Sequence, residues 1–182
     1  MECDSLVKLL MQSVNIDSYS TSSDFIGYSE SCSLQNGKEV LDVFLDFFEG
    51  EFDKCILLCS VTQNIIKEEF FTNDEKENIN HLIRIGWIKP DKEAEEIQKE
   101  FDCYNVENND IDSLHKLCNL VFNGCTYGHV FFMWKEHELI VYPHDDVGFG
   151  VFAPLKTIGE SIGLDFLKEI KKNRLFEVSI VR

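Results

Sequence analysis

The stretch His129-Val-Phe-Phe-Met-Trp-Lys-Glu-His-Glu-Leu-Ile-Val-Tyr-Pro-His-Asp-Asp-Val-Gly-Phe-Gly-Val-Phe152 decides the fold class. It holds three short runs that are rich in aromatic and β-branched residues, which is typical of strands. Lys135-Glu136-His137 separates the first two runs, and Asp145-Asp146-Val147-Gly148 separates the last two. Connections this short favour antiparallel hairpins. We therefore expect a meander of strands over 129–134, 138–142 and 149–152.

Helical patterns surround this meander. Apolar residues recur at a spacing of three and four, and capping residues and glycines mark several ends. The helices expected on this basis are Asp4–Val14, Val40–Phe48, Asn64–Phe71, Glu75–Ile85 with Asn73 or Asp74 as its cap, Asp91–Phe101, Ile111–Val121 with Asp110 as its cap, and Leu164–Lys172. Further strands are expected at Phe25–Tyr28, Lys54–Thr62 and Phe176–Val181.

This order of elements predicts an α+β fold, with an antiparallel or mixed sheet packed against several helices. We expect residues 1–182 to form a single domain, of which residues 1–36 are an N-terminal helix and an irregular segment. The length is enough for one sizeable core.

The net charge of −16 limits the possible partners. Phosphate backbones and anionic membranes both require basic surfaces, so direct binding of nucleic acid or membrane is not expected. An acidic protein is steered toward basic partners, although acidity can also serve solubility alone.

The seven cysteines form no CxxC pair and their number is odd. We interpret them as small buried apolar residues of a reducing compartment. The N-terminal residues lack the basic and apolar regions of a signal peptide, and no apolar run is long enough to span a bilayer. These features predict a cytoplasmic protein.

The segment His144-Asp145-Asp146 is the strongest candidate for a chemical site. Two carboxylates and an imidazole could hold a divalent cation or a small ligand. Adjacent side chains on an extended chain point in opposite directions, however, so a simple turn is the competing interpretation, with Gly148 supplying a positive φ.

Other catalytic signals are weak. His115 and Cys118 could touch on a helix, but Cys118 lies on the apolar face, which raises the pKa of a thiol. No Walker, GxGxxG, GxSxG or HExxH motif occurs. We therefore expect no enzyme activity, no metal ion and no cofactor.

Two acidic bands dominate the remaining surface candidates. Residues 39–53 contain six acids and no base, and residues 91–112 contain nine acids and two bases. Helices built only for solubility usually mix the two signs. The candidate partner-binding residues are Asp42, Asp46, Glu49, Glu93, Glu95, Glu96, Glu100, His144, Asp145 and Asp146.

From Asn36 onward the chain resembles an uncharacterised bacterial domain family. Its members have an aromatic helix, an acidic turn and an apolar strand, which here are similar to Val40–Phe48, Glu49–Asp53 and Cys55–Val61. A later Tyr-Asp-Asp-Arg-Gly motif resembles His144-Asp145-Asp146-Val147-Gly148, but His144 and Val147 depart from it, so no role of the family's Arg carries over.

In format the chain is also similar to immunity proteins of bacterial contact-dependent growth inhibition systems, which are small, acidic and free of catalytic motifs. This resemblance implies an inhibitor that binds a cationic toxin domain, with a nuclease as the expected class, and covers its active site. The alternatives are a metal- or small-ligand-binding enzyme that uses the His144-Asp145-Asp146 loop, and a regulatory protein-interaction domain.

Overall fold

The meander predicted from the central stretch lies at the middle of the sheet. In the computed structural model, which describes residues 3–90 and 100–181, β5 (Thr126–Trp134), β6 (Leu139–His144) and β7 (Gly148–Phe152) are antiparallel neighbours. Their side chains alternate between two buried faces, which explains why the strands are almost continuously apolar.

The described residues form an eight-stranded mixed sheet in the order β3-β2-β5-β6-β7-β1-β8. The other strands are β1 (Phe25–Glu30), β2 (Ile56–Gln63), β3 (Ile88–Lys89), β4 (Asp102–Asn105) and β8 (Glu177–Ile180). β3 pairs in parallel with one end of β2, whereas β4 pairs antiparallel with the other end. This architecture confirms the predicted α+β class.

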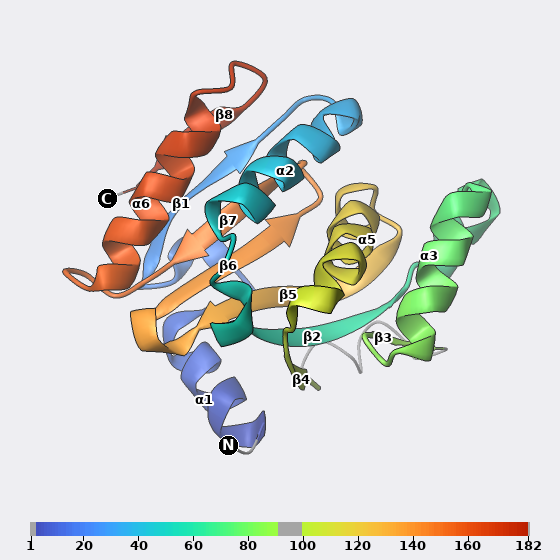
Figure 1. Ribbon diagram of the computed structural model, residues 1–182, viewed down its shortest axis with the longest axis horizontal. Helices are drawn as coiled ribbons and strands as arrows, with labels where there is room; N and C mark the ends of the chain where they lie inside the picture. Colours follow the sequence, from blue (N-terminus) through green and yellow to red (C-terminus); the bar gives the residue numbers. More distant parts are fainter. Residues whose placement is uncertain (1–2, 91–99, 182) are drawn as a thin grey trace.

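Four helices bury their apolar stripes against one face of the sheet. They are α2 (Gly37–Phe47), α3 (Asn73–Arg84), α5 (Ile111–Phe122) and α6 (Ile158–Lys171), and Figure 1 shows α2, α5 and α6 lying over the strands. Phe44 of α2 is fully buried and stacks on Phe149 of β7, with ring centroids 4.6 Å apart.

The helix α1 (Cys3–Ser13) belongs to a second, smaller core on the opposite face. Leu6 and Leu10 pack there with Phe131 of β5, Tyr142 of β6 and Phe152 of β7. Short 3-10 helices complete the chain: η1 (Tyr19–Thr21), η2 (Leu34–Asn36), η3 (Phe52–Lys54), η4 (Ile65–Phe70), η5 (Asn108–Asp110) and η6 (Lys135–His137).

The helix predicted over 164–172 begins six residues earlier than expected. Thr157 caps it by accepting a hydrogen bond from the backbone of Glu160. The sequence pattern did not predict this first part of the helix, because it contains Gly159 and Gly163 and glycine is a poor helix former. A Cβ on Gly159 would lie 2.3 Å from the carbonyl oxygen of His137, so this glycine permits close packing of the helix against η6.

Three further expectations need correction. The segment predicted as a helix over 64–71 is the 3-10 helix η4. The cap of α3 is Thr72, which forms a capping box with Glu75, and neither Asn73 nor Asp74 has that role. The short strands β3 and β4 were not expected, because their pairing with β2 comes from tertiary contacts.

The cysteines are only partly as expected. Cys55, Cys59, Cys118 and Cys125 are buried, but Cys32 is exposed. Cys3 and Cys103 form a disulfide that joins α1 to β4 across 100 positions of sequence. The interpretation of every cysteine as a reduced, buried apolar residue is therefore wrong for these two and for Cys32.

None of the described helices has the length and apolar character needed to cross a membrane.

Candidate functional site

The segment His144-Asp145-Asp146 is a hairpin connection between β6 and β7. His144 pairs with Gly148 across the ladder, which leaves a loop of three residues between them. The positive φ of this turn, 55°, is at Val147 and not at Gly148 as predicted. Glycine is needed at position 148 for lack of space, because a Cβ there would lie 1.8 Å from the carbonyl oxygen of Ser29.

The turn separates the three candidate side chains. Asp145 and Asp146 are exposed, whereas His144 is partly buried. Across residues 3–90 and 100–181, no three His, Cys, Asp or Glu side chains are arranged to hold a metal ion. The turn therefore does not bring these three side chains together as ligands of one metal ion.

The α2 surface, which we define as Asp42, Asp46 and Glu49, follows the outward side of α2 and its end. Asp46 and Glu49 are exposed, and Asp42 is partly exposed. Asp42 accepts a salt bridge of 2.5 Å from Lys38, which lies just before the acidic band. The negative charge of this surface is therefore concentrated toward the C-terminal end of α2.

The second acidic band is only partly described. Glu93, Glu95 and Glu96 lie outside the described residues, as does most of the helix predicted over 91–101. Glu100 is exposed and lies in an irregular segment before β4. Asp112, further along the band, forms a salt bridge with Lys116.

A third surface was not recognised as such from the sequence. Ile66 and Phe70 of η4 are 75% and 76% exposed, the two highest values among the large apolar side chains of the described residues. Lys67, Glu68 and Glu69 between them are also exposed, and so is Asp74 at the start of α3. We call the five residues Ile66, Glu68, Glu69, Phe70 and Asp74 the η4 surface.

The sequence carried a weak signal for this surface. The run Ile65-Ile66-Lys67-Glu68-Glu69-Phe70-Phe71 contains two apolar pairs, and in an α-helix Ile66 and Phe70, four positions apart, would share one face. In the structure Phe71 is buried while Phe70 points to solvent. The tighter 3-10 turn changes which side chains face the core.

Exposed apolar residues among carboxylates have a clear physical use. Burying one such side chain in a partner contributes about 1.5–3 kcal/mol. Aromatic anchors at the centre of an interface commonly dominate its binding energy, while surrounding charges set specificity and association rate. The η4 surface therefore combines an apolar anchor with a charge that selects a basic partner.

The thiol candidates have no catalytic environment. The pKa of Cys118 is raised by burial, and the ring of His115 pairs with Asn119 through its Nδ1. Burial also raises the pKa of Cys59 to about 12. These thiols stay protonated at neutral pH and cannot act as thiolate nucleophiles.

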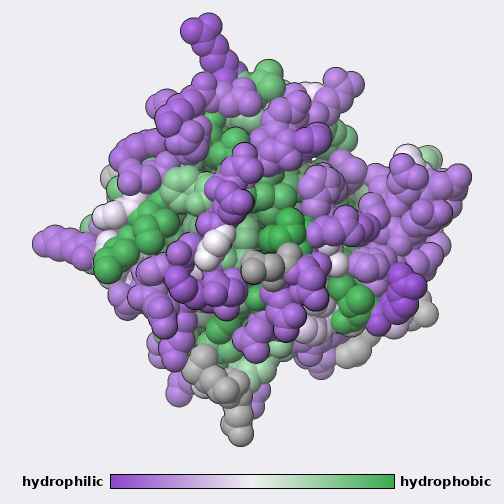
Figure 2. Space-filling model, in the orientation of Figure 1, coloured by the Kyte–Doolittle hydropathy of each residue, from purple (hydrophilic) through white to green (hydrophobic). Residues whose placement is uncertain are grey.

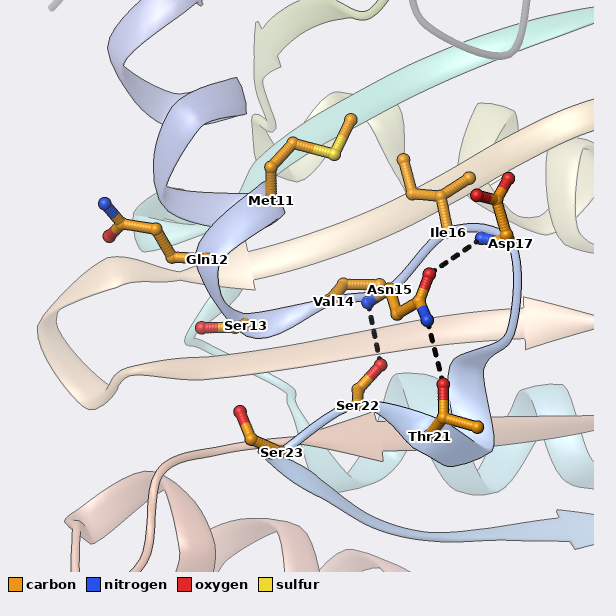
Figure 3. A pocket seen from close by; sticks show the side chains of 10 residues that line it. All are labelled: Met11, Gln12, Ser13, Val14, Asn15, Ile16, Asp17, Thr21, Ser22 and Ser23. Atoms are coloured by element: carbon orange, nitrogen blue, oxygen red, sulfur yellow. Dashed lines mark hydrogen bonds between the residues drawn. The ribbon is translucent and has the colours of Figure 1, made fainter.

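A cavity of about 500 Å³ lies at the loop between α1 and β1 (Figure 3). Some of its polar groups are bonded to one another: the Asn15 side chain donates to Thr21 and accepts from the backbone of Asp17, and Ser22 accepts from the Asn15 backbone. These bonds shape the loop.

Figure 2 shows hydrophilic residues over most of the visible face and over α3. Comparison of the chain with protein-family models, with curated proteins and with solved structures finds no match.

Proposed function

We propose that this chain is a protein-binding domain that recognises a cationic protein through the η4 surface. The observation that carries the proposal is the exposure of Ile66 and Phe70 beside Glu68 and Glu69. Phe70 is the one exposed aromatic side chain among the described residues, and its exposure adds nothing to the stability of the fold. A partner with an apolar pocket rimmed by Lys and Arg would cover it.

The α2 surface supports the same partner chemistry. The exposed carboxylates of Asp46 and Glu49 would attract a basic protein over long range and speed its association. Exposed rim pairs add only about 0–1 kcal/mol each, so the apolar anchor supplies most of the affinity.

Within this class, we propose an immunity protein of the contact-dependent growth inhibition type. It would bind a toxin domain, with a nuclease as the expected class, and cover its active site. A nuclease cleft is basic because it holds phosphate, and carboxylates can occupy it in place of phosphates. The proposed compartment is the cytoplasm, which requires the fold to tolerate reduction of the Cys3–Cys103 disulfide.

The test is a pull-down with this protein as bait from cells that carry its native genomic neighbourhood, at low and high salt. The proposal predicts recovery of a basic toxin fragment, with weaker recovery at high salt. Asp46→Asn with Glu49→Gln should slow association without unfolding the protein. Recovery of no basic protein from cells shown to express the neighbouring genes would contradict the proposal.

A further inference from the structure

The strand β8 forms one edge of the sheet. It ends the strand order and, among the described strands, pairs only with β1, antiparallel and in a regular register. Natural proteins protect such an edge with lysine, proline, a bulge or a covering helix or loop. The run Glu177-Val-Ser-Ile180 contains neither lysine nor proline, and none of these four residues is buried. This edge is therefore open to pairing with another strand.

The hydrogen bonds to β1 show which backbone groups of β8 point outward. The N–H of Val181 donates to the carbonyl oxygen of Ile26, which is the residue opposite it when the register of the two strands is continued. In an antiparallel ladder, residues that bond to one neighbour alternate with residues whose N–H and C=O groups point to the other side. Val181 and Ser179 therefore bond to β1, and Val178 and Ile180 direct their backbone groups outward.

Apolar side chains lie along the same edge. Ile180 is 39% exposed, Val181 is 64% exposed, and Leu175, in the connection before β8, is 49% exposed. Val178, on the same side of the strand as Ile180, packs partly against the larger core. β-branched side chains pack well against neighbours on an adjacent strand. The edge therefore offers apolar contacts in addition to backbone hydrogen bonds.

The strand β8 is self-complementary. When two copies align antiparallel about Ser179, Val178 of each copy lies opposite Ile180 of the other. Both residues point their backbone groups outward, so each such pair can exchange two hydrogen bonds. Ser179 then lies opposite Ser179 of the other copy, and Glu177 lies opposite Val181. No like charges face each other in this register, and the two serines form a favourable polar pair.

The position of α6 suits the same arrangement. Its contacts with the sheet are mainly to β1 and β8, and Figure 1 shows it along this side of the molecule. Because neighbouring strands lie about 4.8 Å apart, pairing of two β8 strands about a two-fold axis would place the two α6 helices roughly 10 Å apart on one face of the joined sheet. Packed helices have axes about 8–10 Å apart. Strand pairing would therefore also bring two helices together.

The charges of α6 are complementary in this arrangement. Residues 158–165 hold two acids and no base, whereas residues 166–172 hold three bases and one acid. Two helices related by the two-fold axis run antiparallel, so the acidic half of each lies beside the basic half of the other. Antiparallel helix dipoles add to this attraction. The charges therefore favour a second copy of this chain over an unrelated strand.

We propose that this chain forms a homodimer in which the β8 strands of two copies pair antiparallel about a two-fold axis at Ser179. The two sheets become one continuous sheet, and the two α6 helices lie side by side on it. The interface is separate from the η4 surface, because β8 ends the strand order on one side and η4 follows β2 near the other. The dimer therefore does not depend on the proposed binding of a cationic partner.

The first test is the mass of the full chain by sedimentation velocity at about 100 µM protein and about 0.15 M salt, which screens the net charge of −16 beyond about 8 Å. The proposal predicts twice the mass of one chain. Ile180→Pro removes an outward N–H and no hydrogen bond to β1, so it should weaken dimerisation at least about tenfold. Ile180→Thr keeps this N–H and should remain dimeric. A single-chain mass for the wild type, or an unchanged dimer of Ile180→Pro, would overturn the proposal.

Cysteine cross-linking tests the register. In a Cys32→Ser background, which lacks the exposed native thiol, Ser179→Cys places two thiols opposite each other and should give a cross-linked dimer on mild oxidation. Glu177→Cys is the matched exposed control, because the two copies of residue 177 would lie about 13 Å apart along the strands. Equal cross-linking of the two variants would overturn the proposal. Both variants keep every backbone hydrogen bond of β8, so this test holds even if Ile180→Pro fails to fold.

Discussion

The hydroxyl of Tyr19 forms a hydrogen bond with Nδ1 of His129, which lies 110 positions further along the chain. This bond ties the irregular N-terminal segment to the centre of the sheet. Tyr19 also packs edge-on against Tyr142, with ring centroids 4.5 Å apart. The N-terminal segment is therefore an integral cover of the second core.

The burial of His129 predicts a pH dependence of stability. Burial lowers the pKa of His129 from 6.5 to about 4, although Asp17 opposes the shift. Between these values the unfolded chain binds more protons than the folded one, so the free energy of unfolding falls as the pH is lowered. Urea unfolding at several pH values should show a smaller fall for His129→Phe than for the wild type.

His137→Gln is the control, because His137 lies in the η6 turn outside both hydrophobic cores. Carboxylates that are hydrogen-bonded in the folded state, such as Glu75, contribute their own acid sensitivity to every variant. The difference between His129→Phe and the control therefore measures the contribution of the buried His129 ring to the pH dependence of the free energy of unfolding. Identical pH profiles of the two variants would contradict this contribution.

The capping box of α3 predicts a local loss of stability. Thr72 accepts a hydrogen bond from the backbone of Glu75, whose carboxylate accepts from the backbone of Thr72. Thr72→Ala should lower the free energy of unfolding by about 1 kcal/mol. Asn73→Ala, one position further, leaves both bonds in place and should cost much less, as chemical denaturation can measure.

The close contact at Gly159 predicts an effect opposite to helix propensity. Alanine is the better helix former, yet its Cβ would meet the backbone carbonyl of His137 at 2.3 Å. Gly159→Ala should therefore lower the melting temperature, while Ser161→Ala, at an exposed position of α6, should leave it equal or slightly higher. If Gly159→Ala left the melting temperature unchanged, η6 would have to move away from the added Cβ, which would contradict the prediction.

The disulfide predicts a stability that depends on redox conditions. It closes a loop of 100 positions between Cys3 and Cys103, and such bonds typically contribute about 2–4 kcal/mol. Cys103→Ser should lower the free energy of unfolding by that amount without reductant, and by nothing once dithiothreitol is present. Cys32→Ser is the control at an exposed free thiol.

Cytoplasmic function requires that the reduced protein stays folded. The buried core formed by α2, α5 and α6 on the sheet involves neither Cys3 nor Cys103, so we expect far-ultraviolet circular dichroism to be unchanged by dithiothreitol at 25 °C. Unfolding on reduction would contradict the proposed cytoplasmic location. It would not change the description of the fold of the disulfide-bonded protein.

The sequence predicted those elements whose signals are local. The meander of β5, β6 and β7 has alternating buried faces and short connections, and α2 and α5 have clear apolar stripes. β3 and β4 depend on pairing with β2, which no local pattern reveals. The first part of α6 was not predicted because it contains glycines, and the close contacts that these glycines permit with other elements cannot be read from the local sequence.

The candidate sites were harder to predict for the same reason. The charges of the acidic bands can be read directly, but the exposure of Ile66 and Phe70 results from a 3-10 turn that resembles a helix in sequence. His144 was singled out with its neighbours Asp145 and Asp146, yet in the structure it lines a cavity together with His129, 15 positions earlier in the chain.

The most direct test of the proposed function is the dissociation constant of the protein captured in the pull-down, measured by titration calorimetry with matched surface variants. Ile66→Ser with Phe70→Ser removes the apolar anchor, and Leu155→Ser with Ile158→Ser changes two residues of similar exposure elsewhere. We predict that the first pair weakens binding by at least about 2 kcal/mol, roughly thirtyfold, and that the second does not. Equal affinities of both variants and the wild type would contradict recognition through the η4 surface.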